Sequence, residues 1–267
     1  MRTLAAVAAL ALLACTPSPK PAGPTDAVTT APPSAGVDTL TTSKGAVTIT
    51  PINHGSLMLQ VAGKTIHVDP STMMGAFDYS KYPKADYVII TDIHFDHMDA
   101  KALDVVATPT TQVIVPPAVA EQWRDRAGLV VVKNGETKDL GLFSVEAVPM
   151  YNVTRGPAPG KLFHDKGRGN GYVLTIGDKR IYISGDTECT PEMKALTNID
   201  VAFLCMNLPY TMPPSEAAVC VNAFKPKVLY PYHYAAPGGA TSNLDELTSA
   251  IDPSAHVEVR RRDWYAK

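Results

Sequence analysis

This sequence has almost no excess of charge of either sign. Its 267 residues include 24 Lys and Arg and 26 Asp and Glu, which gives a formal net charge of -2. Because a nucleic-acid backbone is bound by a positively charged surface, we expect no nucleic-acid partner. The run Arg260-Arg261-Arg262 is short, and we interpret it as the solvated edge of a terminal strand.

Cysteine is also scarce, with four residues in the chain. Apart from Cys15, the remaining cysteines are odd in number and cannot all pair with one another. Cys205 ends an apolar run and Cys220 lies in an expected helix, so we interpret both as small core residues. We interpret Cys189 as a partly buried thiol in a loop.

The chain begins with an apolar segment that does not belong to the folded part. Met1-Arg2 supplies positive charge, and the segment from Leu4 to Leu13 is too short to span a bilayer as a stable helix. Its end, Leu12-Leu13-Ala14-Cys15, resembles the lipobox of bacterial lipoproteins. We expect residues 1–15 to be a lipoprotein-type signal peptide ending at Cys15, whose lipid would anchor the protein to a membrane. The alternative is a plain secreted protein in which Cys15 is incidental.

Residues 16–43 have few apolar side chains and no hydrophobic periodicity. Pro, Thr, Ala and Ser dominate this segment, which cannot bury enough surface to offset the entropy lost on ordering it. We expect a flexible tether between the anchor and one folded domain of residues 44–267. The expected location is the bacterial cell envelope, on the periplasmic side.

Short apolar segments that suit strands alternate with short helical segments from residue 44 onward. Strands are expected at residues 47–50, 57–61, 64–68, 87–91, 112–115, 129–132, 142–148, 172–176, 180–183, 201–205 and 228–230, and helices at 99–106, 117–126 and 215–224. Residues 71–84 and 151–170 are expected to be loops. This alternation by itself indicates an α/β or α+β domain.

Potential metal ligands follow several of these expected strands. Carboxylate oxygens and imidazole nitrogens are the donors that zinc, manganese and iron accept. Scaffolds often place functional side chains in the loops beyond strand ends. The candidates of this kind are Asp92, His94, Asp96, His97, Asp186 and His233.

The first four of these residues resemble a known signature. The run Asp92-Ile93-His94-Phe95-Asp96-His97 resembles the His-x-His-x-Asp-His motif of the metallo-β-lactamase superfamily, with Asp92 in place of the first histidine. Further family signals follow in order: His54-Gly55-Ser56, Val68-Asp69-Pro70, Gly185-Asp186-Thr187 and Pro231-Tyr232-His233-Tyr234. The resemblance implies an α/β fold of four layers, α/β/β/α, with the site at one edge between two sheets. Among subgroups, the chain most resembles the branch with the ascorbate-6-phosphate lactonases and the N-acyl-phosphatidylethanolamine phospholipases.

The resemblance also implies two divalent metal ions. Relatives carry one more histidine directly after a strand, where Met150-Tyr151-Asn152 stands here. His164 is the expected substitute, and the alternative is that His164 is a surface loop residue and the first metal site is weak or empty. The implied ligands are Asp92, His94 and His164 for the first ion, Asp96, His97 and His233 for the second, and Asp186 as the bridge.

The expected metal ions determine which reaction we expect. We expect zinc first. Because Asp92 adds an oxygen donor where relatives have a histidine nitrogen, manganese and iron are competing candidates for the same sites. Asp96 and Asp186 are the expected catalytic residues. A metal-bound hydroxide would attack an ester, lactone, amide or phosphodiester bond of a small-molecule or lipid-like substrate. The chain has no Gly-x-Ser-x-Gly motif for a serine nucleophile.

Two other functions remain open from the sequence. One is an iron-dependent oxygenase, because the superfamily includes such members. The other is a non-catalytic lipoprotein that binds metal.

The roles of the other polar residues are less defined by the sequence. His54 either lines the site or stabilises a turn, while His67 and His256 are expected to be ordinary surface or half-buried residues. The candidates for hydrogen bonding to substrate or supporting the ligands are Arg168, Glu188, Asn207, Tyr210 and Tyr234.

Overall fold

The computed structural model describes residues 30–34, 36–73, 77–236 and 238–265. The expected signal peptide, its Cys15 and the first part of the expected tether lie outside the described residues. None of the helices in the described residues is long and apolar enough to cross a membrane.

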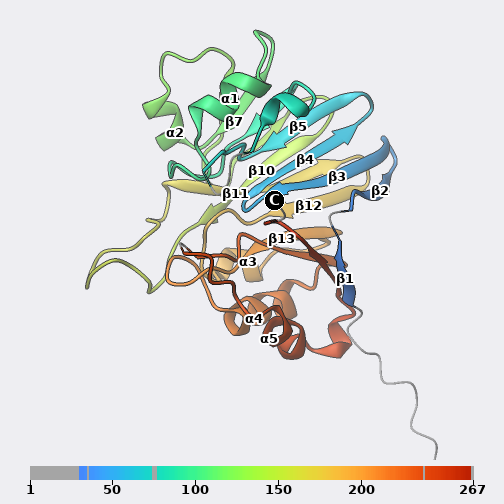
Figure 1. Cartoon of the computed structure of the whole chain (residues 1–267), viewed down its shortest axis with the longest axis vertical. Helices are drawn as coiled ribbons and strands as arrows, with labels where there is room; N and C mark the ends of the chain where they lie inside the picture. Colours follow the sequence, from blue (N-terminus) through green and yellow to red (C-terminus); the bar gives the residue numbers. More distant parts are fainter. Residues whose placement is uncertain (1–29, 35, 74–76, 237, 266–267) are drawn as a thin grey trace, which may run out of the picture.

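Two mixed β-sheets form the centre of the domain (Figure 1). In the larger sheet, β12 to β15 are parallel and β9 to β12 are antiparallel. Its strands, in spatial order, are β1 (Thr30–Ser34), β15 (Glu258–Arg262), β14 (Val228–Tyr232), β13 (Val201–Cys205), β12 (Lys179–Ile183), β11 (Gly169–Ile176), β10 (Ser144–Met150) and β9 (Thr137–Asp139).

The smaller sheet begins with antiparallel strands and continues with parallel ones. Strands β2 to β5 form a meander, and β5 to β8 run parallel. Its strands, in spatial order, are β2 (Asp38–Thr42), β3 (Gly45–Asn53), β4 (Ser56–Val61), β5 (Lys64–Val68), β6 (Tyr87–Ile89), β7 (Gln112–Val115) and β8 (Leu129–Val131).

Helices cover the outer faces of both sheets (Figure 1). Helices α1 (Ala100–Val106) and α2 (Pro117–Gln122) pack on the smaller sheet, and their apolar side chains share a buried cluster with Val88 and Val113. The helices α3 (Pro191–Lys194), α4 (Pro214–Phe224) and α5 (Leu244–Ala250) lie on the larger sheet. The expected α/β/β/α sandwich is therefore confirmed. Short 3₁₀ turns occur at Tyr79–Lys81, within a segment expected to be irregular, and at Pro253–Ala255.

The space between the sheets is filled by apolar side chains. Leu57, Leu59 and Ile66 of the smaller sheet are fully buried, as are Val145 and Leu174 of the larger one. Burying such side chains contributes about 1.5 to 3 kcal/mol each, so this interface is the main source of stability. It holds the two sheets together at the edge where the candidate ligands lie.

The boundary of the folded domain differs from the one expected. Residues 16–43 were expected to be a tether, but β1 and β2 lie inside that range. β1 pairs in parallel with β15, and β2 pairs antiparallel with β3. Arg262 donates two hydrogen bonds to the Asp38 carboxylate, at 2.8 and 2.7 Å, and is buried rather than a solvated strand edge. The partners of these strands lie elsewhere in the chain, so local composition could not show the pairing.

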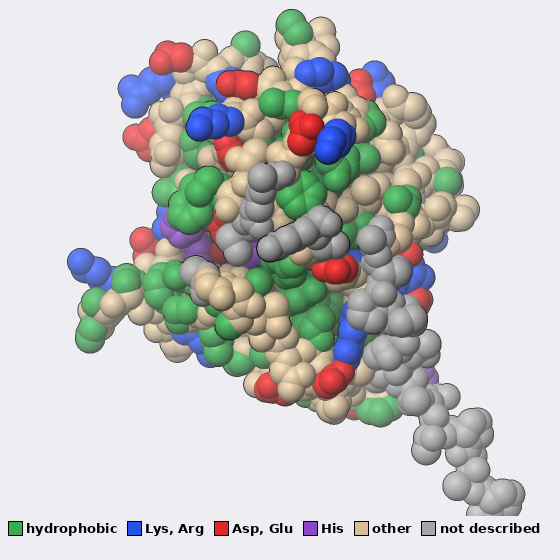
Figure 2. All heavy atoms as spheres, in the orientation of Figure 1, with side chains coloured by type: hydrophobic (Ala, Val, Ile, Leu, Met, Phe, Trp, Pro, Cys, Tyr) green, Lys and Arg blue, Asp and Glu red, His purple; other side chains and the backbone are tan. Residues whose placement is uncertain are grey.

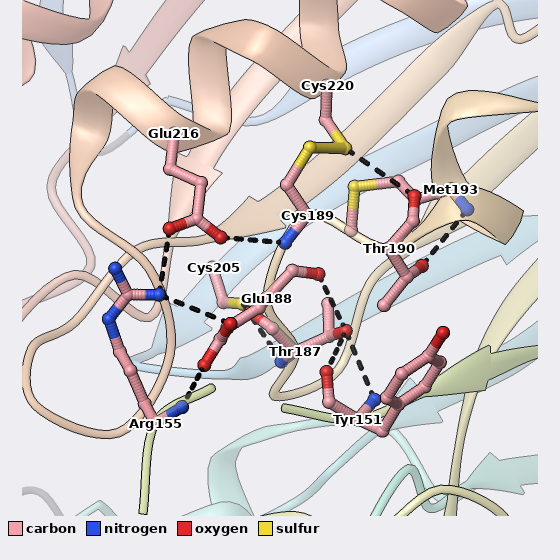
Figure 3. The surroundings of a disulfide bond; sticks show 10 residues. All are labelled: Tyr151, Arg155, Thr187, Glu188, Cys189, Thr190, Met193, Cys205, Glu216 and Cys220. Carbon is pink, nitrogen blue, oxygen red and sulfur yellow. Dashed lines mark hydrogen bonds and ion pairs between the residues drawn. A yellow bond between two sulfur atoms is a disulfide. The ribbon is translucent and has the colours of Figure 1, made fainter. Parts of the chain in front are cut away.

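The cysteines also differ from their expected roles. Cys189 and Cys220 form a disulfide that joins the loop after β12 to α4 (Figure 3). Cys220 does lie in the core, as expected, but the interpretation of Cys189 as a loop thiol was wrong. The two cysteines pair because the fold brings residues 31 positions apart in sequence together. Cys205 is a buried free cysteine, as expected.

Removing this disulfide should destabilise the domain. A bridge that closes a loop of this length restricts the unfolded chain, which corresponds to about 3 to 4 kcal/mol. We expect the double variant Cys189→Ser/Cys220→Ser to unfold at lower urea concentration than the wild type under oxidising conditions. A reductant should lower the stability of the wild type to that of the variant and leave the variant unchanged. Equal stability of the oxidised wild type and the variant would contradict the expectation.

Candidate metal centre

Strand ends bring the candidate ligands together at one edge of the sandwich. Asp92 to His97 follow β6, Asp186 follows β12 and His233 follows β14. His164 comes from the loop between β10 and β11, which protrudes at the left of Figure 1. Figure 2 shows histidine side chains at the surface of this edge, directly above the protruding loop. The ends of strands from both sheets therefore supply the site.

Two glycines allow the close approaches that this edge requires. A Cβ on Gly55 would lie 3.0 Å from Cδ2 of His233 and 3.6 Å from Cε1 of His97. A Cβ on Gly169 would lie 2.9 Å from the carbonyl oxygen of Thr91 and 3.2 Å from the Asp92 carboxylate. A larger residue at either position would displace a ligand or the strand end that carries it.

The candidate ligands form two clusters. Within each cluster, one ligand atom from every residue lies within 4.8 Å of those of the others. The first cluster contains Asp92, His94 and His164, and the second contains Asp96, His97, Asp186 and His233. The sequence predicts the same two sets with Asp186 as a bridge between them, and the structure groups Asp186 with the second set.

The carboxylate of Asp186 lies between the two clusters. Its Oδ2 is 3.3 Å from Nε2 of His97 and 3.5 Å from Nε2 of His164, and its Oδ1 is 3.2 Å from Nε2 of His233. Among the described residues, Asp186 is the one that contacts an imidazole from each cluster in this way. This is the position that a bridging carboxylate needs.

The chemistry of the donor atoms fits a divalent cation. Among the described residues, several buried polar atoms at this site lack a hydrogen-bond partner, and such atoms are rare unless a ligand or ion satisfies them. They are Nε2 of His97 and His164, both ring nitrogens of His233, and Oδ1 of Asp186. Imidazole nitrogens beside carboxylates are the donors that zinc, manganese or iron would use.

The charges within the second cluster stabilise one another. Burial alone would lower the pKa of His97, but the carboxylates of Asp186, Asp96 and Asp69 raise it well above its usual value. Burial likewise would raise the pKa of Asp186, but His233 and His97 hold it well below its usual value. A bound cation would take the place of the imidazolium charge, so metal binding should release protons.

A carboxylate outside the cluster orients His97. Nδ1 of His97 donates to Oδ2 of Asp69 at 2.9 Å, which leaves Nε2 facing Asp186. The Thr91 N–H and hydroxyl group donate to the same Asp69 carboxylate, at 2.8 and 2.6 Å. Carboxylates in this position fix the tautomer and the direction of a metal-binding histidine. Asp69 lies directly after β5, so its place at a strand end was a signal of this role.

The ligand atoms of the first cluster are less available to a cation than those of the second. Arg168 donates to both carboxylate oxygens of Asp92, at 3.0 and 2.9 Å, and Nδ1 of His94 lies 2.9 Å from Oδ2. Burial would raise the pKa of Asp92, but His94 and Arg168 lower it. Both oxygens of Asp92 are already paired, so a cation at this cluster must compete with His94 and Arg168. Arg168 thus contacts a candidate ligand directly, in line with the supporting role expected for it.

The other histidines have clear positions. His164 is buried, which excludes the alternative of a surface loop residue. His54 lies at the site, with Nε2 3.6 Å from Asp96, and burial lowers its pKa to about 4. His67 is fully buried and bonded to the carbonyl oxygen of Pro83, so its interpretation as surface or half-buried was wrong. His256 is exposed, as expected.

A cavity of about 210 Å³ opens beside the two clusters. Aromatic side chains form much of its wall, and the rings of Phe163 and Tyr210 pack edge to face. Tyr234 lies elsewhere, with its hydroxyl group donating to the carbonyl oxygen of Arg262. The residues that line the cavity are His54, His94, Phe95, Asp96, Phe163, His164, Asp186, Asn207, Tyr210 and Ala235.

Known proteins resemble this chain in sequence and structure. The family model for the beta-lactamase superfamily domain matches residues 48–233. A metal-dependent hydrolase from Ligilactobacillus salivarius is 30% identical over 188 residues, which are 68% of this chain and 82% of that protein. A structure from Parabacteroides distasonis, described as a candidate metal-dependent hydrolase, has a TM-score of 0.77 and 42% identity over 86% of this chain and 99% of that chain. A metallo hydrolase from Ignicoccus hospitalis has a TM-score of 0.65 and 22% identity over 80% of this chain and 94% of that one.

Replacing Asp69 with asparagine tests the orientation of His97. In Asp69→Asn, an amide N–H that faces Nδ1 would move the imidazole proton to Nε2, the atom that a cation needs. We expect the affinity for Zn²⁺ to fall by about 10- to 100-fold, measured by competition with a chromophoric chelator. The matched control is Asp104→Asn, because Asp104 is exposed and pairs with Arg126 away from the site. An unchanged affinity in Asp69→Asn would show that Asp69 does not orient His97.

Proposed function

Because this chain belongs to the metallo-β-lactamase superfamily, we propose that it is a metal-dependent hydrolase acting on neutral carboxylic esters or lactones that carry an apolar group. The superfamily and the relatives support a metal-dependent hydrolytic enzyme. The choice of substrate rests on one observation, a cavity with an aromatic wall that ends at two clusters of metal ligands. The resemblance to the branch of lactonases and phospholipases stays a prediction.

Two divalent ions would be held by the two clusters. Asp96, His97, Asp186 and His233 would hold one ion, and Asp92, His94 and His164 would hold the other, with Asp186 reaching both. Zinc suits the four imidazoles, and the three carboxylates make manganese or iron competitors. When bound, such ions lower the pKa of a coordinated water towards neutrality and polarise the oxygen of the bond that is cleaved.

The side chains of the cavity wall would hold a cation, orient the substrate and exclude water. Asp96 lies at the wall with Oδ2 3.3 Å from Nε2 of His233, and its pKa is held low despite burial because His97 and His233 lie beside it. It is therefore ionised, which is the state that coordination of a cation requires. Asn207 and Tyr210 line the same wall and are placed to donate hydrogen bonds to the substrate. The rings of Phe95 and Phe163 would exclude water from the reacting group.

The electrostatics of the cavity favour a neutral substrate over a phosphorylated one. No lysine or arginine lines the cavity within the part of the chain that the structure describes. Arg168 is paired with Asp92, and Arg155 is paired with Glu216 at 2.8 Å. Beside bound divalent cations, a phosphate or phosphodiester is usually also held by arginine or lysine, whereas an acyl chain or ring is held by apolar contacts. An ester or lactone with an apolar group therefore fits the cavity best.

We also propose that the protein is exported and held at the cell envelope by a lipid on Cys15. The disulfide between Cys189 and Cys220 supports export, because disulfides persist in oxidising compartments and are rare in the cytosol of most organisms. An anchored enzyme would act on lipid-like or small molecules at that surface.

A series of p-nitrophenyl esters tests the substrate proposal. We expect kcat/KM of the zinc-loaded full-length protein to rise by up to about fourfold for each methylene group added to the acyl chain, until the cavity is full. Phe163→Ala should flatten this rise because it removes part of the apolar wall. Bis-p-nitrophenyl phosphate should be a much poorer substrate. A preference for the phosphodiester would contradict the proposed substrate class.

Elemental analysis separates the proposal from its alternatives. The protein purified without added metal should contain zinc or manganese, and Asp186→Ala should lose both metal and ester hydrolysis while remaining folded. Val219→Ala on the exposed face of α4 is the control, because Val219 lies outside the site. Iron together with absence of hydrolysis would favour an oxygenase, and absence of bound metal would favour a protein without this catalytic activity.

Fractionation tests the export proposal. The full-length protein should be found in the membrane fraction, with Cys189 and Cys220 protected from alkylation until a reductant is added. Cys15→Ser should move the protein out of the membrane fraction. Wild-type protein with freely alkylated Cys189 in the cytosol would overturn the proposal.

A further inference from the structure

Asn152 belongs to the segment Met150-Tyr151-Asn152, where the resemblance implies a ligand histidine. It lies two residues after β10 and is fully buried. Its Oδ1 accepts hydrogen bonds from the backbone N–H of His164, at 2.9 Å, and from Nδ1 of the same imidazole, at 2.6 Å. Asn152 therefore contacts the candidate ligand that arrives from the loop instead of being a ligand itself.

The surrounding hydrogen bonds fix which way the Asn152 amide points. Its Nδ2 lies 3.0 Å from the Glu188 carboxylate and 2.9 Å from the carbonyl oxygen of Tyr210. An ionised carboxylate and a backbone carbonyl can only accept hydrogen bonds, so the amide nitrogen must face them and the amide oxygen must face His164. The imidazole proton of His164 is then on Nδ1, and Nε2 carries the lone pair.

The lone pair of His164 faces the metal centre. Nε2 lies 3.5 Å from Oδ2 of Asp186 and 3.9 Å from Oδ2 of Asp92, and it is a buried atom without a hydrogen-bond partner among the described residues. With the opposite tautomer, a proton on Nε2 would block coordination. The hydrogen bond that His164 donates to Oδ1 of Asn152 thus decides whether His164 can bind a cation.

Glu188 in turn holds Asn152 and the start of the loop. Its carboxylate is almost fully buried, and it also accepts hydrogen bonds from the backbone N–H groups of Thr154, at 3.1 Å, and Arg155, at 2.6 Å. Its own N–H donates to the carbonyl oxygen of Tyr151 at 3.0 Å. The segment that leads to His164 is therefore ordered around one carboxylate.

The disulfide fixes the position of Glu188 (Figure 3). Cys189 follows Glu188 and is bonded to Cys220 on α4. Glu216, on the same helix, accepts from the Cys189 N–H at 3.2 Å and pairs with Arg155 at 2.8 Å. Helix α4 thereby holds both Glu188 and the loop segment that Glu188 contacts.

We propose that Asn152 and Glu188 are positioning residues that fix the tautomer and direction of His164, so that the first metal site is completed by a ligand from the loop. This inference rests on the proposed function, because it assigns a cause to the affinity of one of the two proposed metal sites. It predicts that loss of Asn152 weakens that site and leaves the other intact.

The tautomer of His164 can be measured without metal. In the metal-free full-length protein at a pH where the imidazole is neutral, the ¹⁵N and ¹³C shifts of His164 should show the proton on Nδ1. Asn152→Ala should lose this preference, and Glu188→Gln should weaken it. A wild-type imidazole with its proton on Nε2 would overturn the inference, whatever the protein binds. This measurement is made on the wild type, so it does not depend on whether the variants fold.

Metal titrations then test the consequence. Wild-type protein titrated with Zn²⁺ against a competing chelator should show two binding events. We expect Asn152→Ala to weaken one of them by about 10- to 100-fold and to change the other by less than about twofold. His164→Ala should weaken the same event, and the double variant should be no worse than His164→Ala alone, because both changes remove one interaction.

The matched control is Asn222→Ala. Asn222 on α4 also makes two hydrogen bonds, to the carbonyl oxygen of Ala250 and from the N–H of Asp252, but it lies outside the site. It should leave both binding events unchanged. Equal weakening of both events in Asn152→Ala, or additive effects with His164→Ala, would overturn the positioning role. A wild type that binds no Zn²⁺ but has the Nδ1 proton would instead refute the proposed function and leave the orienting contact established.

Discussion

The candidate metal centre depends on burying several carboxylates in one place. Asp69, Asp92 and Asp186 are all buried, and an isolated buried carboxylate would be very unfavourable. Each therefore lies beside a group of opposite charge: His97 contacts Asp69 and Asp186, and Arg168 pairs with Asp92. A bound cation would complete this balance. The need to compensate these charges explains why strand ends from both sheets must meet at a single edge.

The local parts of this arrangement could be predicted from the sequence. The apolar run before Asp92 predicts a buried strand, and a helix does begin after Asp99, whose side chain accepts hydrogen bonds from the N–H groups of Lys101 and Ala102. The four ligands from Asp92 to His97 are close because they are close in sequence. The alternation of strands and helices indicated the class of fold, but the four-layer sandwich came from the resemblance.

The parts that could not be predicted depend on contacts between distant residues. Thr39 and Leu40 form a strand because β3 lies beside them, whereas their composition resembles that of the preceding linker. Cys189 and Cys220 pair because α4 packs over the loop after β12, and nothing in their spacing indicates this. Sequence reasoning missed Asn152 for a similar reason. Its importance comes from Glu188 and His164, which reach it from two other segments.

The loop between β10 and β11 contributes neighbouring residues to two different tasks. Phe163 forms part of the cavity wall, and His164 belongs to the first cluster of ligands. A substrate that packs on Phe163 and a cation that binds His164 would both favour the same position of this short backbone segment. Thermodynamic linkage then requires that each raises the affinity of the other by the same factor. Under the proposed function, the apolar part of a substrate helps to retain the metal that cleaves it, and the empty enzyme is the form that loses metal most readily.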